Sequence, residues 1–485
     1  MTIRIIIKDG NFIVPYGYEY EEKSAIFVQT RVKAKKYEID MCSGSILKKM
    51  LLFTIPLMCS SILQLLFNAA DIIVVGQYAG DNSLAAVGST TSLINLLTNL
   101  FLGLSVGGNV MVAHFYGAKQ DRDLEETVHT AILLSLFSGL FLTIVGCLGA
   151  KQILTWMDTP REVLSLATIY LRIYFLGMPA MMAYNFGSAI LRAIGDTKRP
   201  LYYLSFAGVI NVLLNLLFVI VFHMDVAGVA TATAISQCLS AVLVIRCLMK
   251  EEGAIRLNLR ELRIYPDKFF KILQVGIPAG FQGVVFSLSN VVIQASVNSF
   301  GATVVAGNSA ALNIEGFVYM AMNAFHQAAI SFTSQNMGAA KYERINRIVF
   351  TAEACVIVVG LVFGNLVVFF GYPLLGLYTV SAEVAAAGMI RLKIICSVYA
   401  LCGMMDVMVG ILRGMGYAIM PMIVSLIGAC GLRLLWIFTF FRMEQFHTPT
   451  SLYMTYPVSW TLTFLVHVIC FVVVKRRLNK QIKMK

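Results

Sequence analysis

The sequence predicts an all-α membrane protein in which twelve transmembrane helices form two parallel six-helix repeats around a central cleft. Three observations predict this fold class: an apolar composition, recurring apolar segments of helix length, and matching segments in the two halves. Of the 485 residues, 58% are hydrophobic and 13% are charged, whereas soluble domains carry about 25% charged residues. The mean hydropathy is +0.77. Apolar runs of helix length favour helices over a barrel, whose strands are only about 10 residues long.

The predicted spans are long enough to cross the roughly 30 Å hydrocarbon core as helices. Prolines within them (Pro56, Pro179 and Pro278) are compatible with this, because neighbouring helices satisfy the backbone groups that proline frees. The twelve spans are expected at residues 51–78, 84–114, 127–149, 163–190, 200–223, 226–249, 269–299, 304–334, 347–370, 384–411, 418–441 and 453–474.

Segments in the first half recur about 221 residues later. GSAILRAIGDTKRPL returns as VGILRGMGYAIMPM, which places Arg192 on Arg413, and YGAKQDRDLEETVHTA returns as MGAAKYERINRIVFTA, which places Gly117 on Gly338. Because each repeat holds six spans, an even number, both enter the membrane from the same side and are parallel. The expected domains are an N-terminal extension (1–42), an N-lobe (43–249), a basic linker (250–268), a C-lobe (269–475) and a basic tail (476–485).

Basic residues recur in every second connection between spans. We therefore interpret the net charge of +12 as a signal for membrane orientation and not for nucleic-acid binding, because the basic residues lie beside the apolar spans. The positive-inside rule predicts that both termini are in the cytoplasm. Residues 1–40 lack the apolar region and cleavage site of a secretory signal, and Met41 is an alternative start. The ten cysteines form no metal or redox motif and are expected to pack as small hydrophobic residues.

Asp71 lies within the first apolar span. Gln64, Asn68 and Asp71 follow at helical spacing and share one face. A carboxylate at membrane depth is costly and normally faces a bundle interior, so a functional role is expected, with a position at the outer interface as the alternative. The repeat offset of 222 places Ile293 opposite Asp71, so this acid is specific to the N-lobe.

Other polar residues of the N-lobe are candidates for the same site. Asn211 and Asn215 are one turn apart in the fifth span, Thr233 lies in the sixth, and Asn185 in the fourth. One carboxylate among amide and hydroxyl oxygens suits a proton-loaded acid or a hard cation such as Na⁺. Hydrogen bonding between helices is the alternative role for the amides and hydroxyls.

The C-lobe has intramembrane polar residues of its own. Glu315 and Asp406 are expected either to line the cavity as counter-charges for a cationic substrate or to pair with Arg391, Lys393 or Arg433. His326 is either a proton relay or a packing residue. Flexible thioethers suit adaptable surfaces as well as ordinary packing. The candidate cavity residues are Gln64, Asn68, Gln282, Glu315, Met320, His326, Met405 and Asp406.

No phosphate-binding or nucleophile motif occurs in the sequence. There is no G-x-x-x-x-G-K-[ST] and no G-x-S-x-G, so neither an ATP-driven step nor an enzyme activity is expected. No cofactor is expected apart from a coupling ion, and no metal apart from Na⁺ at Asp71.

Taken together, these segments resemble the prokaryotic branch of the multidrug and toxic compound extrusion (MATE) family. The resemblance covers about residues 43–475 and rests on QLLFNAADIIVVG, FYGAKQDRDLEETV, YNFGSAILRAIGDTKRPLYY and NVLLNLLFVIVFHMDVAGVATATAISQ. It implies secondary efflux of varied, often cationic compounds, driven by inward movement of H⁺ or Na⁺. It also implies an ion site that comprises Asp71, Asn185, Asn211, Asn215 and Thr233.

Two positions depart from the pattern of the family. Asn215 stands where many members have an Asp, and Gln282 lies in a seventh span without the acid of other members. Asp71 is therefore the best candidate for coupling. We expect an antiporter of small cationic or amphiphilic compounds, a monomer in the lipid of the cell membrane, with a lipid-linked oligosaccharide flippase or a non-transporting receptor as alternatives.

Overall fold

The computed structural model describes residues 6–8, 11–13, 27–28, 37–157 and 159–483. The chain divides into two units, residues 1–38 and residues 39–485. In the first unit, β1 (Ile6–Lys8), β2 (Asn11–Ile13) and β3 (Phe27–Val28) form an antiparallel sheet in the order β1-β2-β3. The predicted extension at residues 1–42 lies largely outside the described residues.

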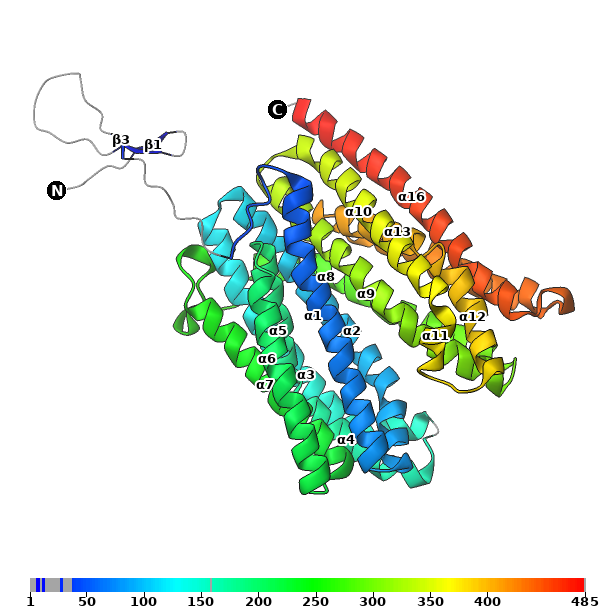
Figure 1. The fold of residues 1–485 in the computed structure, drawn as a ribbon. Helices are drawn as coiled ribbons and strands as arrows, with labels where there is room; N and C mark the ends of the chain where they lie inside the picture. The colour runs from blue at the N-terminus through cyan, green and yellow to red at the C-terminus, as the bar shows by residue number, and fades with distance from the viewer. Residues whose placement is uncertain (1–5, 9–10, 14–26, 29–36, 158, 484–485) are drawn as a thin grey trace, which may run out of the picture. The chain divides into compact units, whose positions relative to one another are not determined.

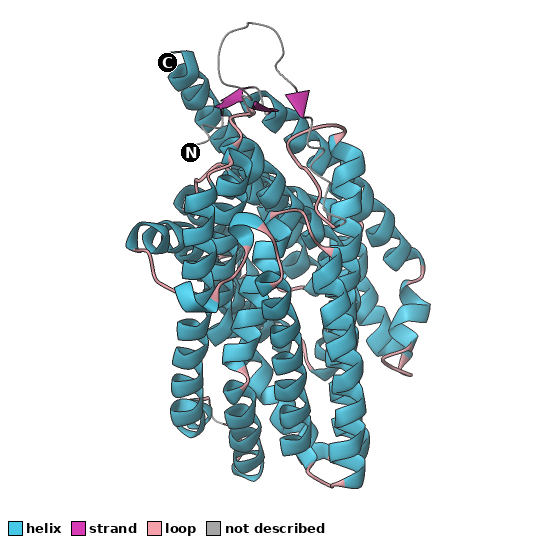
Figure 2. Cartoon of the chain, turned by 90° about the vertical axis from the view of Figure 1, so that its left-hand side faces the viewer, coloured by secondary structure: helices cyan, strands magenta, loops and turns pink. Residues whose placement is uncertain are grey.

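The second unit is built from helices that run side by side, as Figure 2 shows. The N-terminal half contains α1 (Ile46–Tyr78), α2 (Asp81–Ala118), α3 (Asp121–Trp156), α4 (Arg161–Leu176), α5 (Met178–Ala193), α6 (Lys198–Leu216), the π-helix η1 (Leu217–Val221) and α7 (Asp225–Met249). The C-terminal half contains α8 (Pro266–Asn298), α9 (Ala302–Gly338), α10 (Tyr342–Phe369), α11 (Gly371–Gly376), α12 (Ala382–Cys396), α13 (Ala400–Gly414), α14 (Ile419–Ser425), the π-helix η4 (Leu426–Gly431), α15 (Leu432–Phe438) and α16 (Pro449–Lys483).

Nine helices among the described residues are long and apolar enough to cross a membrane, and eleven spans result if each of two bent helix pairs is counted as one. The remaining predicted span is α9, which is 37 residues long but more polar. Its polarity reflects its position, because every residue from 328 to 336 is buried against other helices. With α9 counted, the twelve-helix membrane fold predicted from the sequence is confirmed.

The two halves share details that hydropathy does not reveal. The fourth span is broken between α4 and α5 at 46°, and the tenth is broken between α12 and α13 at 47°. Met178, where α5 begins, lies 221 positions before Tyr399, next to the start of α13. Figure 1 shows α3–α7 on one side of the bundle and α10–α16 on the other, with α1 and α2 between them.

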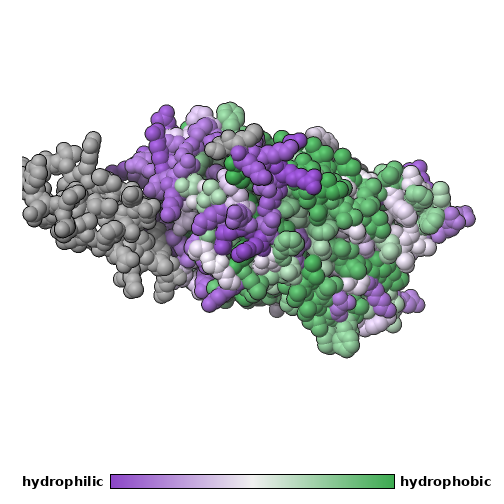
Figure 3. Space-filling model, turned by 90° about the horizontal axis from the view of Figure 1, so that it is seen from above, coloured by the Kyte–Doolittle hydropathy of each residue, from purple (hydrophilic) through white to green (hydrophobic). Residues whose placement is uncertain are grey.

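The start of α1 and the C-terminal end of α16 lie at the same end of the bundle, which we call the linker end because residues 250–265 connect α7 to α8 there (Figure 1). The opposite end, with the turns at residues 79–80 and 299–301, is called the loop end. Figure 3 looks onto the linker end and shows hydrophilic residues gathered beside a hydrophobic flank. Large apolar side chains such as Leu148, Phe350 and Phe369 are exposed on the flanks, as expected where helices face lipid.

The two halves are packed tightly at the linker end. A Cβ added at Gly117 of α2 would lie 2.1 Å from the Gln335 carbonyl oxygen of α9, and one added at Gly338 of α9 would lie 1.9 Å from the His114 carbonyl oxygen of α2. His114 and Gln335 are themselves 221 positions apart, as are the two glycines. This reciprocal contact is the mark of a pseudo-two-fold axis between parallel repeats.

Candidate functional site

Asp71 of α1 lies in a buried polar cluster within the N-terminal half. Its Oδ1 accepts a hydrogen bond from the Asn215 side-chain amide, and its Oδ2 accepts one from the Thr233 hydroxyl at 3.4 Å. Asn211 donates to the Thr233 hydroxyl at 3.4 Å, and Asn215 donates to the Asn211 oxygen at 3.4 Å. The structure therefore brings together Asp71, Asn211, Asn215 and Thr233, which we call the N-lobe site.

Local sequence explains how three helices meet at this point. Asn211 and Asn215 are one turn apart and share a face of α6, and the π-helix η1 begins two residues after Asn215. Gly208 lets α1 approach α6, because a Cβ at Gly208 would lie 1.8 Å from the Phe67 ring. π-helical segments are frequent at functional sites.

Among the described residues, no basic side chain balances the charge of Asp71. No described Lys, Arg or His lies within 4 Å of its carboxylate. The Asn215 Oδ1 beside it is buried and accepts no hydrogen bond from any described residue. An uncompensated carboxylate at this depth is costly unless it is protonated or a cation joins it.

The pocket at Asp71 is small, with a volume of about 50 Å³. Gln64 and Asn68 line it together with Asp71, so the structure places them at the N-lobe site and not in the large cavity where we expected them. Such a volume accommodates an ion or a water, since a water takes about 30 Å³ of liquid volume, but no organic substrate.

Asn185 lies away from this cluster. Its amide donates to the Met181 carbonyl one turn earlier in α5, at 2.8 Å. It forms no hydrogen bond to Asp71 among the described residues, and it does not line the pocket. The structure thus separates Asn185 from the site with which the family resemblance groups it.

A cavity of about 600 Å³ lies mainly within the C-terminal half, and we call it the C-lobe cavity. Drug-sized ligands occupy pockets of roughly 300–1,000 Å³. Of the predicted cavity residues, the structure places Glu315, Met405 and Asp406 on its wall. Residues of α2, α8, α9, α12, α13, α15 and α16 and the connection between α12 and α13 contribute the rest, among them Asn99, Phe286, Asn308, Tyr319, Arg391, Tyr399, Arg433, Tyr456 and Trp460.

Glu315 is held by Arg391. The guanidinium donates from Nη2 to Oε1 at 2.5 Å and from Nε to Oε2 at 3.1 Å. Its Nη1 donates to the Asn308 oxygen at 3.0 Å, and the Tyr453 hydroxyl donates to the same oxygen at 3.1 Å. Both alternatives considered for Glu315 therefore apply, because it lines the cavity and is paired internally.

Three other predicted residues are not on the cavity wall. Gln282 is buried and accepts a hydrogen bond from Arg413 at 2.8 Å. His326 is buried with Nδ1 2.6 Å from the Asp406 backbone oxygen, and Met320 is half-buried in α9. The structure places none of these three among the lining residues.

Several polar residues were missed as primary candidates. Arg391 and Arg433 were considered only as partners of acids, although intramembrane cations indicate function as much as acids do. Glu353 of α10 was overlooked, and its carboxylate oxygens are buried without a described partner. The aromatic wall from α16 carries no sequence signal that separates it from ordinary packing.

A second cavity, of about 680 Å³, lies between α2 and α8. Ser287, Asn290 and Gln294 line both this cavity and the C-lobe cavity, so the two adjoin. The lining comes from the loop-end halves of these helices and includes Met157, just beyond the end of α3. The central cleft therefore opens between the lobes toward the loop end.

The linker-end half of the interface is closed by polar contacts. The Ser331 hydroxyl of α9 donates to the Asn109 side-chain oxygen of α2 at 3.1 Å, and the Ser334 hydroxyl donates to the Val110 carbonyl at 2.6 Å. Gln335 reaches the Ala193 carbonyl of α5 at 2.6 Å. The two lobes are thus joined at one end and separated at the other.

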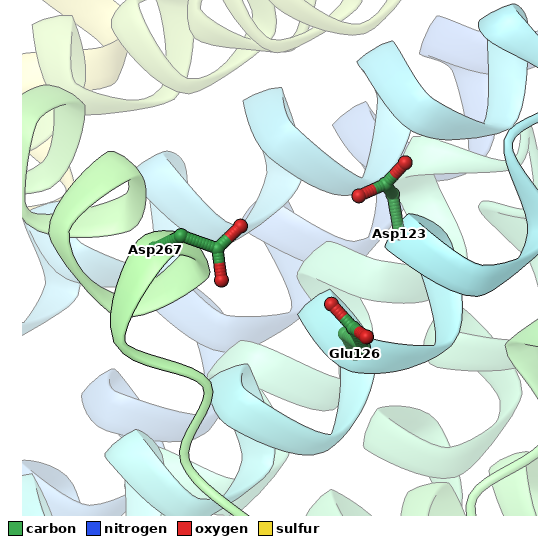
Figure 4. Close-up of side chains that lie close together, drawn as sticks. All are labelled: Asp123, Glu126 and Asp267. Carbon is green, nitrogen blue, oxygen red and sulfur yellow. The ribbon is translucent and has the colours of Figure 1, made fainter.

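Three carboxylates lie close together at the linker end, on α3 and at the start of α8: Asp123, Glu126 and Asp267 (Figure 4). The Lys268 ammonium lies 2.6 Å from Asp123, 3.3 Å from Glu126 and 2.5 Å from Asp267. This lysine compensates the cluster, which therefore acts as a brace between α3 and α8.

Comparison with known proteins agrees with this architecture. The MatE family model matches twice, at residues 56–217 and 278–439, one match in each half. Two parallel repeats around a cleft are an architecture found in membrane transporters. The chain belongs to the MATE family.

Relatives and solved structures extend this comparison. The chain is 27% identical over 394 residues to the probable multidrug resistance protein YoeA of Bacillus subtilis, covering 80% of this chain and 85% of the relative. It is 24% identical to the probable multidrug resistance protein NorM of Thermotoga maritima, covering 80% and 84%.

Two solved structures share the fold. One is described as the outward-facing conformation of a multidrug resistance MATE family transporter. It matches with a TM-score of 0.84 and 21% identity, and the match covers 91% of this chain and 98% of that one. The other, from Pyrococcus furiosus, is described by a reverse polarity of its binding pocket, with a TM-score of 0.83, 21% identity, and coverage of 90% and 98%.

Proposed function

We propose that this protein is a secondary multidrug efflux antiporter that exports small organic compounds in exchange for H⁺ or Na⁺ by alternating access. The observation that carries the proposal is the half-buried Asp71 carboxylate, which has neutral hydrogen-bond donors but no described cationic partner. Membership of the MATE family and the printed names of the relatives, multidrug resistance proteins, support the substrate class.

The N-lobe site supports the coupling step. A proton would neutralise Asp71, and a sodium ion would be held by oxygens of Asp71, Asn215 and Thr233, which are the hard donors that such an ion prefers. Either ion removes the cost of the buried charge, so its binding and release bias the packing of α1 against α6 and α7.

The cleft supports the transport step. It is open toward the loop end and closed at the linker end, and parallel repeats around a central site exchange such states by rocking of the lobes. Positively charged connections at the linker end support a cytoplasmic location for that end and for both termini. The state described here would then release substrate outward and load the ion from outside.

Purified protein in proteoliposomes tests this proposal. An inwardly directed H⁺ gradient and an inwardly directed Na⁺ gradient are imposed separately, and counter-movement of a fluorescent organic cation and of a fluorescent organic acid is followed. One gradient is expected to drive transport, and Asp71→Asn is expected to reduce it to the level of protein-free liposomes, because the neutral amide cannot exchange the ion.

Asp225→Asn is the matched control, since it makes the same chemical change at an exposed acid at the start of α7. It is expected to transport as the wild type does. Transport of neither probe under either gradient would overturn the proposed function, and unchanged transport by Asp71→Asn would overturn the role of Asp71.

A further inference from the structure

The C-lobe cavity contains an arginine that the proposed ion coupling does not use. Arg433 lies on α15, two residues after the π-helix η4 ends. Its side chain lines the cavity and is only 5% exposed. Such a buried cation at membrane depth needs a partner.

The hydrogen bonds of Arg433 leave part of its guanidinium free. Nε donates to the Ser459 hydroxyl at 2.8 Å, whereas the buried Nη2 has no partner among the described residues. The Cζ atom lies 4.1 Å from the centre of the Tyr456 ring and 5.5 Å from that of Trp460. Two aromatic rings therefore fix the plane of the guanidinium without using its N–H donors.

Arg391 also lines the cavity, and its guanidinium already has hydrogen-bond partners within the protein. It forms a two-point ion pair with Glu315 and a further hydrogen bond to Asn308. No described carboxylate lies within 4 Å of Arg433. The difference between these two described arginines is that one forms a direct ion pair with an acid and the other does not.

The charged residues around the cavity also indicate that an arginine there lacks a matching acid. Once Glu315 is assigned to Arg391, Asp406 is the acid left on the cavity wall. Asp406 interacts electrostatically with both Arg413 and Arg433. Two guanidinium groups share one carboxylate, so this part of the C-lobe carries an excess positive charge.

We infer that the C-lobe cavity binds the acid group of an aromatic organic anion or zwitterion, with the Arg433 guanidinium as its donor. The guanidinium matches a carboxylate geometrically, and charge-assisted hydrogen bonds of this kind are about twice as strong as neutral ones. Tyr399, Tyr456 and Trp460 line the same cavity and supply rings on which a planar substrate packs. This inference rests on the proposed transport function and assigns its substrate class.

The inference differs from the expectation drawn from the sequence. Glu315 was one candidate counter-charge for a cationic substrate, with internal pairing as the alternative, and both of its oxygens accept hydrogen bonds from Arg391. An acid that is already paired attracts a cation weakly, whereas an arginine without an acid attracts an anion. The sign of the ligand charge that this cavity prefers is therefore set by Arg433.

A matched pair of dyes tests the inference on the purified full-length protein in detergent. Rhodamine 110 carries a free carboxylate, and rhodamine 123 is its methyl ester, so the two differ in the acid group alone. Binding is measured by fluorescence polarisation without any ion gradient. Wild-type protein is expected to bind rhodamine 110 about tenfold more tightly or better, as expected for one charged hydrogen bond.

Arg433→Gln is expected to remove this preference and to leave the affinity for the ester within about twofold. Arg442→Gln, which removes an exposed arginine at the loop end, is the control for net charge and is expected to keep it. Size-exclusion profiles show whether the variants are folded, and Arg433→Lys, which keeps the charge, is expected to retain part of the preference.

The wild-type comparison is decisive even if no variant folds. Equal or tighter binding of the ester would overturn the inference while leaving the proposed antiport intact. Preference for the acid in a protein that moves neither probe under either gradient would support the site and overturn the transport function instead. The two failures are therefore distinguishable.

Discussion

Asp71 and Glu315 are two acids within the same bundle, the first half-buried and the second buried, and the structure stabilises them in opposite ways. Glu315 receives two hydrogen bonds from Arg391, which compensates its charge permanently. Asp71 receives hydrogen bonds only from the neutral Asn215 and Thr233. Binding an ion would gain little at an acid that is already paired with an arginine, whereas it would compensate the charge of Asp71. This contrast is why we assign coupling to the N-lobe site.

Thr233 provides a residue-scale test of that site. Thr233→Val keeps the shape of the side chain but removes the hydroxyl that donates to Asp71 and accepts from Asn211. Loss of one such hydrogen bond costs about 1 kcal/mol, so the apparent affinity for the coupling ion is expected to fall about fivefold. The measurement is the ion dependence of transport in proteoliposomes.

Thr231→Val is the matched control, two positions away on the same helix. Its hydroxyl donates to the Ala227 carbonyl of its own helix at 2.7 Å, and Thr231 does not line the pocket at Asp71. The control is expected to change the ion affinity by less than about twofold. Equal effects of the two substitutions would argue against a role for the Thr233 hydroxyl.

Element packing differs between the two seams that join the lobes. Along the α2–α8 seam, a Cβ at Gly103 would lie 2.1 Å from the Gly280 nitrogen, and one at Gly280 would lie 2.2 Å from the Leu100 oxygen. Small residues spaced in this way allow close approach of helices in a membrane.

The repeat-related seam, between α1 and α9, is lined differently. The repeat offset puts Ala324 at the position of Gly103 and Met58 at the position of Gly280. An apolar cavity of about 340 Å³ lies on this side, lined by Met58 and Val318 among others. The pseudo-symmetry of the helices is therefore not matched by symmetry of packing, because residue size at equivalent positions differs.

Gly103→Ala tests the tight seam. The new methyl group would collide with the backbone of α8, and overpacking of this kind costs about 1–3 kcal/mol. We expect a lower midpoint of thermal unfolding in detergent, by several degrees, followed by tryptophan fluorescence. Gly88→Ala, in the same helix but with open space around its added Cβ, is expected to leave the midpoint unchanged, and a similar loss in both variants would contradict the importance of the seam.

At the scale of the whole molecule, the basic connections lie at one end of the bundle and the adjoining cavities lie toward the other. The linker end carries basic connections and is closed by contacts such as Ser331 with Asn109, whereas the adjoining cavities lie toward the loop end. If basic connections are cytoplasmic, this state faces outward.

Cysteine labelling tests that orientation. Asn82→Cys, exposed at the loop end, is expected to react with a membrane-impermeant maleimide in intact cells, above the background from the native cysteines. Lys250→Cys, exposed in the linker, is expected to react only after permeabilisation. The reverse pattern would place the termini outside and would require the opposite direction of transport.

Much of the fold follows from properties that can be read along the chain. Hydropathy marks eleven of the spans, and the repeat offset shows that the two halves are parallel. Even α9, which is too polar for a simple hydropathy criterion, coincides with the span predicted at residues 304–334. These are local or periodic properties, and in a bilayer the need to satisfy every backbone group leaves little choice but helices.

What the sequence by itself determined was the membrane fold, its twofold repetition and the presence of an acid, Asp71, in the first span. Only the tertiary structure decided which polar groups meet. It joined Asp71 to Asn215 across 144 positions and Arg391 to Glu315 across 76, separated Asn185 from the N-lobe site, and left Arg433 without a direct ion pair among the described residues. The reason is physical: the cost of a buried charge depends on neighbours that other helices supply, and those neighbours are set by the packing of the bundle and not by spacing along the chain.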